Sequence, residues 1–152
     1  GKKTREHVID TGRFVRAVRA AIGDRMDTIV CFQVPNARYV LGDDRVLGFS
    51  AHDEHELRDA DDHGCDFALL SPVWPTKSKP NAAFLTVPHA AAMTAAARIP
   101  VVWLGGVDAA RIAEIAELPA AQRPVGVAVR SAIMHADDPK AAAIELRNAW
   151  PK

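Results

Sequence analysis

Short apolar runs that alternate with helix-forming segments are the feature that most constrains the fold of this chain. Each run has about four to six residues, which is too short for a helix and suits a buried strand. Four of the runs are followed by a segment with helical signals. Such alternation predicts an α/β protein in which helices cover a parallel sheet. The expected strands cover residues 28–32, 45–50, 66–70, 101–104 and 125–129.

The segments beside these runs carry residues that start and stop helices. Asp53 and Glu56 form a capping box, and Gly64 is suited to end the helix that they begin. Pro88 fits the first turn of an alanine-rich segment, because no intrahelical N–H bond is made there. The expected helices span residues 11–22, 53–64, 88–98, 108–118 and 138–150.

The length of the chain limits how many strands it can supply. We expect the 152 residues to form a single (β/α) domain over residues 1–152. A complete eight-stranded barrel takes about 250 residues, with about 200 as a lower bound. The expected strands therefore predict a shortened parallel (β/α) fold of the TIM-barrel type. Because an incomplete barrel leaves strand edges unpaired, we expect a homodimer or a partner chain to cover them.

Charge and hydropathy argue against several classes of protein. The 19 basic residues balance 19 acidic residues, whereas a nucleic-acid-binding protein would need a basic excess. No apolar run approaches the length that crosses a membrane, and the N-terminal residues show no signal-peptide pattern. Cys31 and Cys65 lack the spacing of a metal site and fit a reducing compartment. The expected location is the cytoplasm, with no nucleic-acid or membrane partner.

Polar turns follow three of the expected strands and carry groups that bind anions. The stretch 71–79 combines prolines, hydroxyls and lysines directly after the third strand. Gly105 and Gly106 follow the fourth strand, where a glycine pair lets backbone N–H groups approach a phosphate. Arg130 and Ser131 follow the fifth strand. Because phosphate sites of (β/α) barrels usually follow the last two strands, these turns predict a small phosphorylated ligand. The alternative is a solvated basic loop beside two ordinary turns.

From about residue 46 to residue 150, the chain resembles the C-terminal part of the thiamine phosphate synthase and thiazole tautomerase superfamily. Four motifs occur in the family's order and at similar spacing. They are 48–52 (GFSAH), 66–79 (DFALLSPVWPTKSK), 99–107 (IPVVWLGGV) and 126–133 (GVAVRSAI). Residues 1–45 match poorly, so the resemblance implies a TIM-barrel-like fold that is truncated or shortened at its N-terminal side.

The resemblance implies a transferase that joins a pyrimidine diphosphate to a thiazole phosphate in thiamine biosynthesis. It assigns catalytic roles to Ser50 and Lys79, which would contact the diphosphate. The diphosphate would leave together with Mg²⁺, the cofactor that the resemblance implies. Without the resemblance, Ser50 would be interpreted as a helix-start residue and Lys79 as solvated surface. The residues that would bind the thiazole phosphate are Thr76, Ser78, Gly105, Gly106, Arg130 and Ser131.

The chain also departs from the family pattern. The strip of glutamine, arginine, glutamate and lysine that holds the pyrimidine diphosphate in the family is not found. Pro72 stands where the tautomerase branch has a histidine, which disfavours tautomerase activity. The alternatives to a synthase-like transferase are a non-catalytic phosphate-binding or regulatory form of the same fold, and a different phosphate-binding barrel enzyme. The metal ligands stay unassigned, and the nearest candidates are Gln33, Asn36, Asp43 and Asp44.

Overall fold

A computed structural model describes residues 28–31, 37–43, 45–76 and 81–151 of the chain. The expected helix over residues 11–22 lies outside these ranges. The strands are β1 (Thr28–Cys31), β2 (Val46–Ala51), β3 (Phe67–Leu70), β4 (Val101–Leu104) and β5 (Gly126–Ala128). The helices are α2 (Ala37–Leu41), α3 (Glu54–Asp62), α4 (Val87–Ala96), α5 (Ala109–Ala116), α6 (Ser131–Met134) and α7 (Pro139–Ala149), with a 3₁₀ turn, η2 (Ala120–Gln122).

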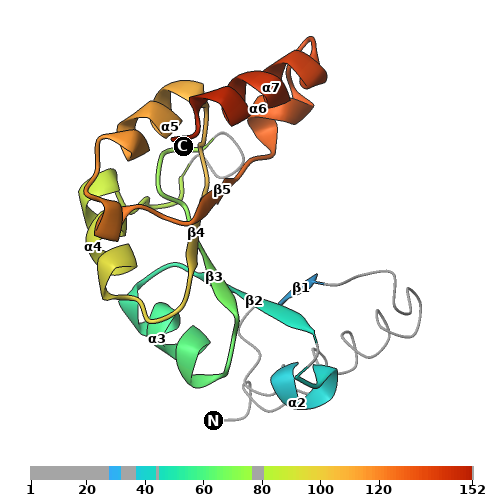
Figure 1. Ribbon diagram of the computed structural model, residues 1–152, viewed down its shortest axis with the longest axis vertical. Coiled ribbons are helices and arrows are strands. Elements are labelled where there is room, and N and C mark those ends of the chain that lie inside the picture. The colour runs from blue at the N-terminus through green and yellow to red at the C-terminus, as the bar shows by residue number, and fades with distance from the viewer. Residues whose placement is uncertain (1–27, 32–36, 44, 77–80, 152) are drawn as a thin grey trace.

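The strands form one parallel sheet in the order β1-β2-β3-β4-β5 (Figure 1). Each strand pairs with its neighbour in sequence, so every connection crosses back to the start of the next strand. Leu70 is level with Ala51 on one side and with Trp103 on the other. Because all strands point the same way, their carboxyl ends meet at one edge of the sheet. The predicted α/β fold with a parallel sheet is confirmed.

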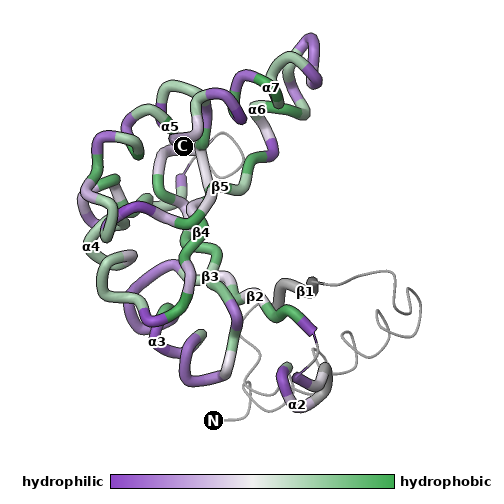
Figure 2. Tube along the Cα trace, in the orientation of Figure 1, coloured by the Kyte–Doolittle hydropathy of each residue, from purple (hydrophilic) through white to green (hydrophobic). Residues whose placement is uncertain are grey.

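The core lies where the central strands meet the helices beside them. In β3 and β4, alternate residues are buried, as the pleat of a strand requires. Trp103 of β4 is fully buried, and its indole Nε1–H donates to Thr94 Oγ1 of α4 at 2.8 Å. Its ring packs edge-on against Trp74, with 5.8 Å between the ring centroids. Figure 2 shows the apolar residues concentrated along β3 and β4, whereas α3 is largely hydrophilic.

Three aspartates begin helices, as the sequence predicts. The carboxylates of Asp53, Asp108 and Asp138 accept hydrogen bonds from backbone N–H groups in the first turns of α3, α5 and α7. A cap of this kind accepts hydrogen bonds from first-turn N–H groups that have no acceptor within the helix. The helix starts can therefore be read from the sequence to within a residue at these three places.

The elements that the sequence pattern does not predict are the shortest ones. α2 has five residues, α6 has four and η2 has three, so none is long enough to show a helical period. Within the described ranges, no helix combines the length and the apolar character that crossing a membrane requires.

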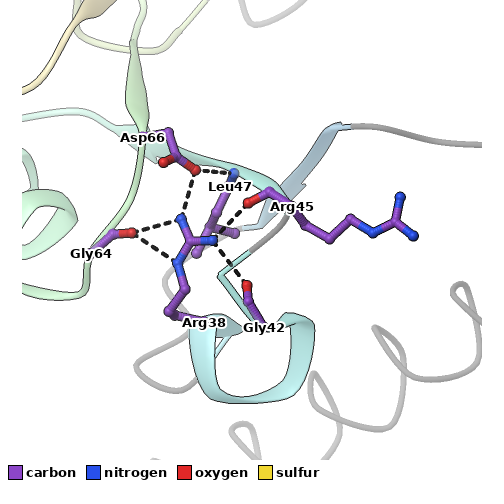
Figure 3. A network of polar contacts seen from close by, with 6 residues as sticks. All are labelled: Arg38, Gly42, Arg45, Leu47, Gly64 and Asp66. Carbon is purple, nitrogen blue, oxygen red and sulfur yellow. Dashed lines mark hydrogen bonds and ion pairs between the residues drawn. The ribbon is translucent and has the colours of Figure 1, made fainter.

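A network of polar contacts joins α2 to the amino ends of β2 and β3 (Figure 3). The Arg38 guanidinium donates to Asp66 Oδ2 at 2.6 Å, and the same oxygen accepts from the N–H of Leu47 at 2.6 Å. Burial alone would raise the pKa of Asp66, but the hydrogen bond from Leu47 and the charge of Arg38 hold that pKa below its ordinary value. Arg38 also donates to the backbone carbonyls of Gly42, Arg45 and Gly64.

Candidate functional site

A cleft of about 630 Å³ lies beyond the carboxyl ends of β3, β4 and β5. Three loops form it, one after each of these strands. Since the strands are parallel neighbours, loops that are far apart in sequence leave the sheet side by side. The lining consists of residues 71, 72, 75 and 76 after β3, residues 104–108 and 111 after β4, and residues 128–132 and 135 after β5.

The loop after β3 is held to the turn after β4 by backbone hydrogen bonds. The N–H of Val73 donates to the carbonyl of Leu104 at 3.1 Å, and the N–H of Trp74 donates to that of Gly105 at 3.2 Å. Val73 and Trp74 are themselves buried. These contacts continue the β3–β4 pairing past the ends of the strands, so the two walls of the cleft have a fixed separation.

The glycine pair after β4 is required by both conformation and space. Gly105 has φ +94° and Gly106 has φ +73°, values that residues with a side chain rarely adopt. A Cβ on Gly105 would lie 2.7 Å from the Cβ of Pro72, and one on Gly106 would lie 2.6 Å from the carbonyl oxygen of Pro75. The backbone after β4 therefore passes directly against the loop after β3, and no side chain fits between them.

Arg111, in the first turn of α5, holds the glycine turn after β4 in place. Its side chain donates to the carbonyl oxygen of Gly106, and its guanidinium carbon lies 5.8 Å from the centroid of the Trp74 ring. Its own backbone N–H donates to Asp108 Oδ1 at 2.9 Å. The Trp74 indole N–H reaches Glu114 Oε2 at 3.4 Å, which fixes the ring from its other end. A single arginine thus bridges the helix start, the glycine turn and the loop after β3.

Among the described residues, the cleft is lined by two arginines and one aspartate. Arg111 comes from α5 and Arg130 directly precedes α6, with His135 at the other end of α6. The acidic residue in the lining is Asp108, whose Oδ1 is occupied by the cap of α5. A concave site with a basic lining favours an anionic ligand. Hydroxyl groups, which can donate to such a ligand, are supplied by Ser71, Thr76 and Ser131.

The structure brings five of the predicted phosphate-binding residues to this one cleft. Thr76 lies on the loop after β3, Gly105 and Gly106 follow β4, and Arg130 and Ser131 follow β5. The convergence of the three turns agrees with the expectation from sequence. The individual roles of these residues stay predictions.

The other three predicted site residues do not lie in the described lining of the cleft. Ser50 is the next-to-last residue of β2 and is 7% exposed, so its side chain belongs to the interior. Ser78 and Lys79 lie outside the described residues. Ser50 is therefore placed one strand away from the cleft, and the two residues after Thr76 are not placed.

Sequence reasoning did not identify Arg111, Asp108 or His135 as lining residues. Asp108 was expected as a helix cap, which it is, but a cap at the start of α5 also faces the site. Arg111 lies three residues after this cap, one helical turn along, and that spacing is the signal that could have identified it.

The described residues do not supply a metal site. Within the ranges 28–31, 37–43, 45–76 and 81–151, no three His, Cys, Asp or Glu side chains lie close enough together to hold a metal ion. Asp43 is exposed before the amino end of β2, at the edge of the sheet opposite the cleft. Mg²⁺ needs carboxylates beside its phosphates, and in the described part of the lining Asp108 alone could provide one. Gln33, Asn36 and Asp44 lie outside the described residues.

Comparison with known sequences identifies related proteins. Residues 31–133 match the family described as thiamine monophosphate synthase. The thiamine biosynthesis bifunctional protein ThiM/ThiE of Symbiobacterium thermophilum is 40% identical over 111 residues, which cover 72% of this chain and 22% of that protein. The thiamine-phosphate synthase of Syntrophomonas wolfei is 32% identical over 120 residues, covering 78% of this chain and 56% of that protein. The chain thus spans about half, or less, of the length of these relatives.

Comparison with solved structures supports the fold. A thiamine phosphate pyrophosphorylase from Pyrococcus furiosus superposes with a TM-score of 0.72 and 22% identity, covering 96% of this chain and 76% of that one. A 3-hexulose-6-phosphate synthase superposes with a TM-score of 0.67 and 20% identity, covering 90% of this chain and 68% of that one. At these identities the likeness concerns the parallel α/β architecture.

Proposed function

The chain belongs to the thiamine monophosphate synthase family, and from that membership we propose that it binds a thiazole phosphate in the cleft after β3, β4 and β5. We further propose that it acts as a transferase that joins this substrate to a pyrimidine diphosphate. The relatives matched are named as thiamine-phosphate synthases, which supports this chemistry.

The observation that carries the proposal is the convergence of three strand ends on one basic cleft. Backbone of a glycine turn, hydroxyl groups and two arginines line the same space. Such a set of donors recognises a phosphate dianion through hydrogen bonds and charge. The side chains of Leu104, Val107 and Val129 in the same lining would supply apolar contacts for a ring attached to that phosphate.

In the proposed reaction, the carbon–oxygen bond of the pyrimidine diphosphate breaks and the diphosphate leaves with the electron pair. The ring nitrogen of the thiazole then forms the new carbon–nitrogen bond. The protein's contribution is to hold both substrates so that the two reacting atoms meet. Thr76, Gly106 and Ser131 would fix the thiazole phosphate, while Ser50 and Lys79 would contact the diphosphate, as the family resemblance implies.

Magnesium belongs to this proposal through the family resemblance alone. The described residues do not form a carboxylate set that fits the ion, so no step of the reaction is assigned to it here. Omission of Mg²⁺ from the assay tests whether the ion takes part.

The decisive experiment measures thiamine phosphate formed from the two substrates, with and without Mg²⁺, together with binding of thiazole phosphate by calorimetry. The proposal predicts both binding and turnover, and it predicts that Lys79→Ala abolishes turnover. Binding without turnover would instead support the second candidate, a non-catalytic phosphate-binding or regulatory form. That candidate is favoured by the lack of a metal site among the described residues. Absence of both binding and turnover would overturn both candidates.

We also propose that a second chain covers the sheet edge beside the cleft. In the described sheet, β5 pairs with β4 and forms one edge. Val125, directly before β5, and Met134 of α6 are 65% and 72% exposed. Exposed apolar side chains beside the outer edge of β5, which has no partner strand in the described sheet, are the features that an interface would bury.

A further inference from the structure

We propose that Arg111 is a ligand-binding residue of the cleft, and that its guanidinium selects phosphorylated ligands over the corresponding unphosphorylated alcohols. This inference rests on the proposed function, because it assigns a specificity to the same cleft. It adds the side chain of Arg111 to a set of predicted donors that consists of Arg130, backbone groups of the glycine turn and hydroxyls.

The first argument is the position of the side chain. Arg111 lines the cleft between the loop after β3 and the turn after β4, and its side chain is 29% exposed. It is therefore open to a ligand while partly shielded from solvent. A guanidinium in such a place interacts more strongly with an anion than one on an open surface, because the effective dielectric is lower.

The second argument is that the guanidinium is held in place without using all of its donors. Nη1 donates to the carbonyl of Gly106, and the plane lies near the Trp74 ring. Within the described part of the chain, the Arg111 side chain contacts the Gly106 carbonyl, the Trp74 ring and the Asp108 carboxylate. Nε and Nη2 keep their N–H groups for a ligand, and a guanidinium presents such donors in the fork that suits phosphate oxygens.

The third argument concerns Asp108, the acidic neighbour that could cancel this charge. Its Oδ1 accepts from the backbone N–H of Arg111 at 2.9 Å, whereas its Oδ2 is 3.7 Å from Nη1. The longer distance is that of a partly exposed ion pair without a hydrogen bond, which offsets the guanidinium charge only weakly. The carboxylate thus caps α5, and the guanidinium stays available to a second anion.

The test compares binding of thiazole phosphate with binding of the thiazole alcohol by calorimetry, using the full chain and its variants. For Arg111→Gln we expect affinity for the phosphate to fall roughly 10-fold to 100-fold, the range for a lost hydrogen bond to a charged group. Affinity for the alcohol should stay within about twofold. Arg111→Lys should recover part of the loss, because it keeps the charge but not the fork. Higher salt should weaken phosphate binding to the wild type more than to Arg111→Gln.

The control is Arg98→Gln, which removes the same charge at the opposite edge of the sheet, where Arg98 is 71% exposed beside Asp61 and Asp62. This variant should bind the phosphate like the wild type. Equal losses for phosphate and alcohol in Arg111→Gln would show a purely structural role and overturn the inference. Unchanged phosphate binding in Arg111→Gln would also overturn it, while leaving the proposed function intact. A wild-type chain that binds neither compound would overturn the proposed function and the role of Arg111 together.

Discussion

At the scale of single residues, a side chain can be excluded from a glycine position by a positive φ or by nearby atoms, and the glycines of this chain distinguish the two causes. A Cβ on Gly106 meets both a positive φ and three heavy atoms within 3 Å, including the Pro75 carbonyl oxygen. Gly64 has a positive φ of +68° but nothing within 4 Å, and Gly126 has neither restriction. An added side chain would therefore meet both conformational strain and a steric clash at Gly106, strain alone at Gly64, and neither at Gly126.

We predict that Gly106→Ala is the least stable of the three Gly→Ala variants, Gly64→Ala is intermediate, and Gly126→Ala is the most stable. Gly126→Ala should be neutral or stabilising by up to about 1 kcal/mol, because it restricts the unfolded chain. Gly64→Ala should cost roughly 1–2 kcal/mol from the left-handed conformation. Gly106→Ala should cost more, about 3 kcal/mol, since the backbone must also shift. Urea unfolding measures these values, and equal losses for Gly64→Ala and Gly106→Ala would contradict the close approach.

Asp66 predicts a pH dependence whose sign follows from its lowered pKa. A carboxylate with a lower pKa in the folded state stabilises the fold above the ordinary aspartate pKa of about 3.9, and this contribution is lost as the pH falls through the folded value. Asp66→Asn should therefore be less stable than the wild type at pH 7. The difference should shrink below about pH 4.

Urea midpoints of both proteins between neutral and acidic pH would check this expectation. Asp43→Asn serves as the control, since it removes the same charge from an exposed side chain nearby. A difference between Asp66→Asn and wild type that stays constant down to the lowest pH would argue against the Arg38 network as its source.

At the scale of elements, α4 is joined to β4 by one buried polar contact. Thr94 Oγ1 accepts from the fully buried Trp103 indole at 2.8 Å and donates to the Ala90 carbonyl at 2.7 Å. Thr94→Val keeps the shape of the side chain but leaves the indole N–H without its acceptor. We expect a loss of about 1–3 kcal/mol in the free energy of unfolding.

Thr94→Ser retains the hydroxyl and is the matched control for this contact. Thermal or urea unfolding should place it closer to the wild type than Thr94→Val. If Thr94→Ser loses more stability than Thr94→Val, then packing of the Thr94 methyl group rather than the hydrogen bond dominates the contact between α4 and β4.

Local signals within each element decide whether the sequence could predict it. The strands were found because short apolar runs end at turn residues, and α3, α5 and α7 because aspartates begin them. The predicted boundaries differ from the observed ones by one or two residues, as at β2, which continues to Ala51, and at α3, which ends at Asp62. α2 could not be predicted, because Arg38 secures it through contacts with residues up to 28 positions away. Interactions that distant leave no periodic pattern in the segment itself.

At the scale of the whole molecule, parallel topology made the site predictable in outline. Once the strands are parallel neighbours, the turns after β3, β4 and β5 must meet at one edge. Thr76 and the glycine pair follow from that rule. Arg111 does not follow from the strand order, because it lies on α5, one turn after the Asp108 cap, and contacts Gly106 and the Trp74 ring from there. The burial of Ser50 depends on its surroundings in the fold rather than on a local pattern within β2.

The open edge of the sheet carries the prediction for assembly. If a second copy covers the region of Val125 and Met134, light scattering after size exclusion should give the mass of two chains at low micromolar concentration. Met134→Lys should shift the equilibrium toward the monomer, because burying a lysine ammonium group in the interface without an opposite charge costs free energy. A single-chain mass for the wild type at this concentration would remove the proposal of a homodimer.

The sequential strand order also has a consequence for biosynthesis. Each strand that leaves the ribosome finds its pairing neighbour already made, since β2 pairs with β1, β3 with β2, and so on to β5. The nascent chain can therefore extend its sheet one unit at a time, in the direction of translation. Of the three loops, the one after β5 is made last and supplies Arg130 and Ser131, so the pocket has all three of its sides only after the ribosome has released this loop.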